Sequence, residues 1–267
     1  MNLTKEQLAK MLRVEQFPLS SKYDPEWVLE NEMGPNALWL TEALCQVMEL
    51  KPGMRVLDMG CGKAMSSIFL AKEFDLQVWA TDLWIEATDN WKRIRETGVE
   101  DRVFPIHAEA HALPYAEEFF DAIVSVDSYH YYGTDDLYLK YFIRFLKPGG
   151  QIGIVVPGLV RDFEGEVPSY LTKRQPSGGR FWDPAECFSF HTAEWWRRHW
   201  EQTQLVEVRH VDYLSEGWRF WLQFEKTKAS VGTSRYDDEI PALSADRGRY
   251  LGFVRMVARR KETRNKA

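Results

Sequence analysis

Short runs of β-branched and aliphatic residues alternate with helix-length segments through the middle of this chain, and this alternation limits the folds open to it. The runs before residue 157 lie at 55–59, 77–81, 103–106, 122–126 and 151–156. The helix-length segments between them lie at 64–74, 85–97 and 135–145. Strands that alternate with helices form parallel sheets of right-handed βαβ units.

Later segments extend the same pattern. Helices are expected at 192–202 and 218–226, and two more strands at 206–211 and 252–258. The whole pattern predicts an α/β fold of the Rossmann-like type, in which a seven-stranded, mostly parallel sheet carries helices on both faces.

The composition is that of one folded domain and excludes several classes of protein. Of the 267 residues, 45% are hydrophobic and 28% charged, which suits a substantial core. The formal net charge of −6 gives no general attraction to nucleic acid or to an anionic membrane. Three scattered cysteines form neither a disulfide framework nor a metal-binding pair, and no run approaches the roughly 20 apolar residues of a membrane span. We therefore expect a cytoplasmic protein without a metal.

A glycine turn follows the first strand and indicates a nucleotide-like ligand. The segment Val56–Gly62 is a hydrophobic strand that runs into glycines, and a helix begins near Ala64. Glycines allow the backbone to approach a ligand, and the helix start offers unpaired N–H groups. A dinucleotide fingerprint would carry a third glycine, but Lys63–Met65 follow instead, so hydride transfer is disfavoured.

Two acidic residues narrow the choice of ligand. Asp58, on the first strand, would repel a pyrophosphate but can accept a hydrogen bond from an ammonium group, directly or through water. Asp82 ends the second strand, where a carboxylate can accept both hydroxyls of a ribose. A nucleoside cofactor with an ammonium group would satisfy both.

With these features the chain resembles the class I S-adenosylmethionine-dependent methyltransferases, particularly those that act on small molecules. The resemblance covers roughly Met54 to Pro157, and its matching segments are Val56–Gly62, Thr81–Leu83, Glu109–Tyr115, Phe120–Ser125 and Leu146–Gly150. It implies that S-adenosylmethionine is the cofactor. The residues that it implies for cofactor binding are Asp58, Gly60, Cys61, Gly62, Asp82, Leu83, Glu109, Ala110, Asp127 and Tyr23.

His130 is the candidate catalytic residue. It lies in the segment Ser125–Tyr132 after the fourth strand, where related small-molecule methyltransferases place a histidine that faces the methyl group. A histidine can accept a proton near neutral pH. The alternative is a structural histidine held by hydrogen bonds.

The resemblance implies transfer of a methyl group to a nitrogen, oxygen or carbon atom of a small molecule, with S-adenosylhomocysteine as product. Methylation of a macromolecule and a noncatalytic S-adenosylmethionine-binding protein are the alternatives. We expect a single methyltransferase domain over residues 1–267. Its expected parts are an N-terminal helical cover (1–53), a cofactor-binding core (54–158) and two insertions over the acceptor site (159–191 and 215–249). Within the cover we expect helices at about 4–13 and 36–50, and in the second insertion a polar loop after the helix at 218–226.

Overall fold

The computed structural model describes residues 3–234 and 238–262 and contains a seven-stranded sheet in the order β3-β2-β1-β4-β5-β7-β6. The strands are β1 (Arg55–Met59), β2 (Gln77–Asp82), β3 (Val103–His107), β4 (Phe120–Val126), β5 (Leu146–Leu159), β6 (Val206–Tyr213) and β7 (Leu251–Arg260). β7 is antiparallel to both of its neighbours, and the other pairs are parallel. The predicted seven-stranded, mostly parallel sheet is confirmed.

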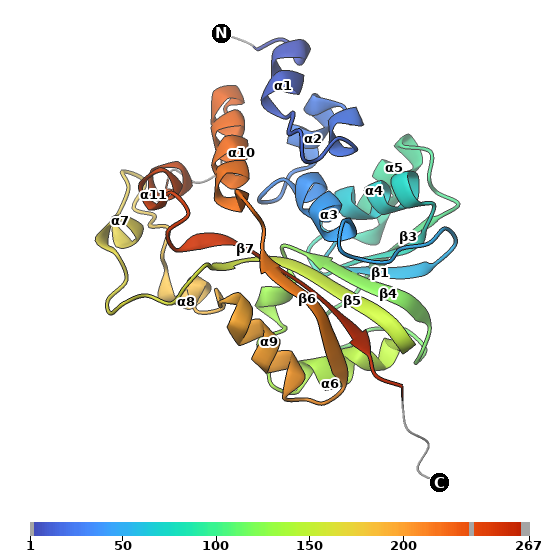
Figure 1. The fold of residues 1–267 in the computed structure, drawn as a ribbon. Coiled ribbons are helices and arrows are strands. Elements are labelled where there is room, and N and C mark those ends of the chain that lie inside the picture. Colours follow the sequence, from blue (N-terminus) through green and yellow to red (C-terminus); the bar gives the residue numbers. More distant parts are fainter. Residues whose placement is uncertain (1–2, 235–237, 263–267) are drawn as a thin grey trace.

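Helices cover both faces of the sheet (Figure 1). One face carries α3 (Ala37–Cys45), α4 (Met65–Phe74) and α5 (Ala87–Glu96), and the other carries α6 (Tyr138–Phe142) and α9 (Ala193–Glu201). Buried apolar side chains form one large cluster on each side of the sheet. The carboxyl ends of β1, β2 and β4 consequently meet at one edge of a rigid core, where ligands of open α/β sheets bind.

The N-terminal segment contains one helix more than the sequence predicts. Besides α1 (Lys5–Met11) and a short turn at Ser20–Lys22, it forms α2 (Pro25–Asn31), which begins with the side chain of Asp24 accepting from Glu26 N. The helix expected over residues 36–50 ends at Cys45. It stops because the chain turns to meet β5, where Gln151 bonds both the N–H and the carbonyl of Glu49.

The two later insertions are partly helical. The first contains the single-turn helices α7 (Ser169–Thr172) and α8 (Pro184–Cys187). The second contains α10 (Gly217–Val231) and α11 (Glu239–Asp246), although the sequence predicts a polar loop after residue 226. α10 stands beside α1 and α2 (Figure 1), so the second insertion and the N-terminal segment together roof the same end of the sheet. Residues 235–237 of this insertion lie outside the described residues.

One buried carboxylate fastens the N-terminal segment to α3. Glu42 accepts from Leu19 N at 3.0 Å, from Ser20 N at 2.7 Å and from Ser20 Oγ at 2.6 Å. Glu42→Ala leaves these donors without their acceptor, so we expect a loss of about 1–3 kcal/mol in the free energy of unfolding. Urea denaturation measures this loss, with the exposed Glu15→Ala as control. Equal midpoints for the two variants would contradict this role for Glu42.

Candidate cofactor site

The turn after β1 has a backbone that only glycine fits at two positions. Gly60 and Gly62 have φ angles of 74° and 53°. A Cβ atom at Gly60 would lie 1.8 Å from Ser128 Oγ, and one at Gly62 would lie 2.8 Å from Met33 Sδ. The N–H groups of Gly60 and Cys61 both donate to the carbonyl of Thr81, at 2.8 and 3.1 Å. The turn is therefore held against β2 on one side and leaves no space for side chains on the other.

Asp82 joins this turn to the end of β2. Its Oδ2 accepts from Gly62 N at 2.8 Å, and its Oδ1 accepts from Trp84 N at 2.8 Å and Ile85 N at 3.0 Å. An ionised carboxylate offers about four acceptor positions. Asp82 thus fixes two loops and still has acceptor capacity toward the cavity that it lines.

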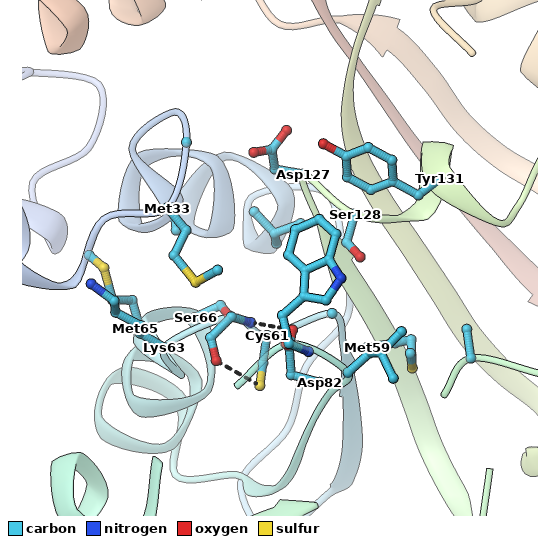
Figure 2. A pocket seen from close by; sticks show the side chains of 18 of the residues that line it. Met33, Met59, Cys61, Lys63, Met65, Ser66, Asp82, Asp127, Ser128 and Tyr131 are labelled. Atoms are coloured by element: carbon cyan, nitrogen blue, oxygen red, sulfur yellow. Dashed lines mark hydrogen bonds between the residues drawn. The ribbon is translucent and has the colours of Figure 1, made fainter. Parts of the chain in front are cut away.

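A cavity of about 300 Å³ lies over these strand ends, beneath the N-terminal segment. Its walls come from the turn after β1, the ends of β2, β3 and β4, and the cover residues Met33, Gly34 and Pro35. Figure 2 shows Asp127 and Tyr131 at one end of this cavity and Asp82 at the opposite end. The sequence-predicted residues that line it are Gly60, Cys61, Gly62, Asp82, Leu83, Glu109, Ala110 and Asp127.

Three other predicted site residues are not among the side chains that line the cavity. Asp58 is fully buried, and its Oδ2 accepts from Ser66 Oγ at 2.5 Å and Ser67 Oγ at 2.6 Å. Burial raises the pKa of Asp58 to about 6, against the lowering effect of these two hydroxyls. Since Ser66 lines the cavity, Asp58 reaches the site only through that hydroxyl.

Tyr23 lies within the N-terminal segment and is not among the residues that line the cavity. Its ring stacks on Trp27, and its hydroxyl donates to Glu73 Oε1 at 3.5 Å. The cover residue that does reach the glycine turn is Met33, whose sulfur lies against Gly62. The sequence offers no local motif for Met33, because its approach depends on how the cover folds over the sheet.

His130 is buried behind the cavity wall, with 2% of its surface exposed. Its ring packs against Tyr131 and edge-on against Phe190, and burial lowers its pKa to about 3. In the part of the chain that the structure describes, its Nδ1 has no hydrogen-bond partner. Tyr131, the next residue along the turn, lines the cavity instead.

Glu109, which the resemblance assigns to cofactor binding, lines the cavity. Its carboxylate accepts from His111 N at 2.7 Å and lies 2.7 Å from His111 Nδ1. Desolvation opposes ionisation, but the His111 contacts outweigh it and lower the pKa of Glu109. Within the described ranges, no three His, Cys, Asp or Glu side chains come together as a metal site would require.

Comparison with known proteins agrees with this geometry. Residues 56–150, from the glycine turn to the start of β5, match a family described as a methyltransferase domain. This match and the relatives that follow support a class I S-adenosylmethionine-dependent methyltransferase.

Among curated members of this methyltransferase class, 27-O-demethylrifamycin SV methyltransferase from Amycolatopsis mediterranei is 29% identical over 241 residues, covering 83% of this chain and 82% of that protein. Methyltransferase GfsG from Streptomyces halstedii is 32% identical over 127 residues, so the match spans about half of each protein, 46%. Among solved structures, the [4+2]-cyclase SpnF shares the fold, with a TM-score of 0.65, 20% identity and coverage of 97% and 96%.

Proposed function

We propose that this protein transfers the methyl group of S-adenosylmethionine to a small-molecule acceptor. One observation carries the proposal: a single cavity joins the glycine turn and Asp82 at one end to Asp127 and Tyr131 under the cover at the other. The similarity to the rifamycin methyltransferase over four fifths of both chains supports it.

The residues at the first end suit this cofactor. Gly60 and Gly62 line the cavity, and because glycine carries no side chain, a ligand there can approach their backbone closely. Asp82 offers one further acceptor position for a ribose hydroxyl, and the apolar Leu83 and Ala110 can enclose an adenine ring. The bound cofactor supplies a methyl group on a positively charged sulfur. What the protein adds is alignment of the acceptor and exclusion of water.

The second end suits a partly apolar acceptor. The cover contributes Met33 and Pro35, and the turn after β4 contributes Tyr131. Trp84 lies at the mouth with 68% of its surface exposed, and its ring centroid is 5.9 Å from that of Tyr131. We propose that these aromatic rings guide the acceptor into the cavity.

The net charge and the cysteines bear on the class of acceptor and on the location of the protein. The net charge of −6 favours a small molecule over nucleic acid as acceptor. Cys45, Cys61 and Cys187 are free and buried, which supports a reducing, cytoplasmic location. None of the helices in residues 3–234 and 238–262 has the length and apolar character that a membrane crossing needs.

Binding of S-adenosylhomocysteine tests the cofactor assignment. At a concentration of about 100 times its Kd, the ligand is expected to stabilise the folded protein by about 2.7 kcal/mol, seen as a rise in Tm. Trp84 fluorescence is expected to change on binding, because the indole lies at the cavity mouth. Unchanged Tm and fluorescence, with adenosine as the matched control ligand, would rule out the site.

Methyl transfer itself is tested by following labelled S-adenosylmethionine against a panel of small molecules. Appearance of the label in a small-molecule acceptor supports the proposed methyltransferase activity. Cofactor binding without transfer to any compound supports the noncatalytic alternative, and transfer only to a protein or nucleic acid fraction supports the macromolecular one.

A further inference from the structure

Asp127 is placed in the cavity by an unusual backbone. It follows β4, its N–H donates to Val155 O at 2.8 Å, and its φ angle is 52°, in the left-handed region. Aspartate occupies this region more readily than most residues, but it is still a strained conformation. The turn brings the carboxyl to the cavity wall beside Tyr131 (Figure 2).

The cover closes tightly over this carboxyl. A Cβ at Gly34 would lie 2.7 Å from Asp127 Oδ2, so the carboxyl packs directly on the glycine backbone. The carbonyl of Gly34 in turn accepts from Lys228 Nζ at 3.4 Å. Asp127 of the core therefore packs against Gly34 of the cover, and Gly34 in turn contacts Lys228 of α10.

Buried charges surround Lys228. Its Nζ lies 2.6 Å from Glu225 Oε1 and 3.5 Å from Glu32 Oε2, and all three side chains are at most 5% exposed. Glu239 lies beside Glu225, and burial with this neighbour raises the pKa of Glu239 to about 9, which keeps it neutral.

These groups set the charge of Asp127. Burial raises its pKa to about 7, Lys228 acts to lower it and Glu225 acts to raise it. A carboxyl that gains and loses a proton near neutral pH is matched to general-base catalysis. His130, by contrast, does not line the cavity.

We propose that Asp127 accepts the proton of a hydroxyl acceptor during methyl transfer, and that Lys228 is a positioning residue that keeps this carboxylate ionised. The inference rests on the proposed function. The acceptor oxygen bonds to the methyl carbon while the carbon–sulfur bond breaks and its electron pair stays on sulfur. The acceptor proton moves to Asp127 and then to water. A hydroxyl fits better than an ammonium, because Lys228 already places a positive charge behind the carboxylate.

Thermal unfolding tests the ionisation of Asp127 without any acceptor. Because the pKa in the folded protein, about 7, is above the ordinary 3.8, protonated Asp127 contributes stability that is complete below about pH 4 and is lost as the pH rises through 7. Asp127→Asn has no such proton to lose. Its Tm relative to the unsubstituted protein should rise between about pH 5 and 7 and then level off.

The matched control is Asp101→Asn, since the Asp101 side chain is 76% exposed, and its Tm difference should not change with pH. If the Tm difference between Asp127→Asn and the unsubstituted protein also did not change with pH, the proposal would be overturned. Lys228→Met should move the Asp127 transition to higher pH and Lys228→Arg should not. If Lys228→Met fails to fold, an unmoved transition in Lys228→Gln overturns the role of Lys228.

Turnover tests the reaction. Labelled S-adenosylmethionine is supplied with a set of alcohols and phenols, each paired with the amine that carries NH2 in place of OH. We expect transfer to hydroxyls, with kcat/KM rising to a plateau above about pH 7. Asp127→Asn should lower kcat roughly 100-fold or more, and titration of the variant with S-adenosylhomocysteine separates this loss from any change in cofactor affinity.

Three outcomes would overturn the base assignment: transfer to amines only, full activity of Asp127→Asn, or loss of activity in His130→Gln but not in Asp127→Asn. Failure of the cofactor to bind would instead count against the proposed function. The pH dependence of the Asp127→Asn Tm would then still show whether the carboxyl ionises as argued.

Discussion

Asp82→Ala is expected to lower the affinity for S-adenosylhomocysteine by roughly 10- to 100-fold, because a hydrogen bond to a charged group contributes about 1.5–3 kcal/mol and the ribose would lose the one that Asp82 can still accept. The substitution also removes the acceptor that holds Gly62 N, Trp84 N and Ile85 N. The glycine turn would lose its fixed position against β2. Both effects act in the same direction on cofactor binding.

Calorimetric titration measures this affinity, and circular dichroism checks the fold. Asp82→Asn retains one acceptor oxygen and should lose less affinity than Asp82→Ala. Asp89→Ala, on the surface of α5, is the control, since its side chain is 53% exposed and outside the cavity. An Asp82→Ala variant that binds within about threefold of the unsubstituted protein would show that this carboxylate does not hold the ribose.

The sequence alone predicts the strand-end half of the site because that half is local. Gly60, Gly62 and Asp82 lie in segments whose strand, turn and helix can each be recognised from neighbouring residues. Parallel strands then bring their carboxyl ends together without further information. Eight of the predicted residues therefore line one cavity, namely Gly60, Cys61, Gly62, Asp82, Leu83, Glu109, Ala110 and Asp127.

The half of the cavity under the cover could not be predicted in the same way because it depends on distant segments. Lys228 and Gly34 are 194 residues apart in sequence and meet only because α10 packs beside the cover. The turn after β4 shows a second difficulty. It is a 3₁₀ turn over Tyr129–Tyr131, in which successive side chains point about a third of a circle apart. Tyr129 and His130 are buried, whereas Tyr131 lines the cavity.

The absence of α2 and α11 from the prediction has a related cause. The cap of α2 is visible in the sequence at Asp24–Pro25, but the helix that follows is only seven residues long. α11 is eight residues long and buries Ala242, Leu243 and Asp246. Helices this short are marginal alone and form because tertiary packing stabilises them, so a local pattern indicates them poorly.

Lys228→Met is expected to lower the free energy of unfolding by about 3–5 kcal/mol, as removal of one partner of a buried ion pair does. The Glu225 side chain is 1% exposed and would lose the ammonium that lies 2.6 Å from its Oε1. Lys226→Met, two residues earlier on the exposed side of α10, removes the same charge and should change stability by less than about 0.5 kcal/mol.

A double variant separates the ion pair from simple packing. In Lys228→Met with Glu225→Gln, the charge of Glu225 is removed together with that of Lys228, so Glu32 alone keeps a carboxylate that faced the lysine, and glutamine can still accept a hydrogen bond from the neutral Glu239. We expect part of the lost stability to return. If the double variant were as unstable as the sum of the two single variants, the loss would come from packing of the lysine stem. Because α10 holds the cover through Lys228 and Gly34, the same measurement shows how firmly the roof of the cavity is fixed.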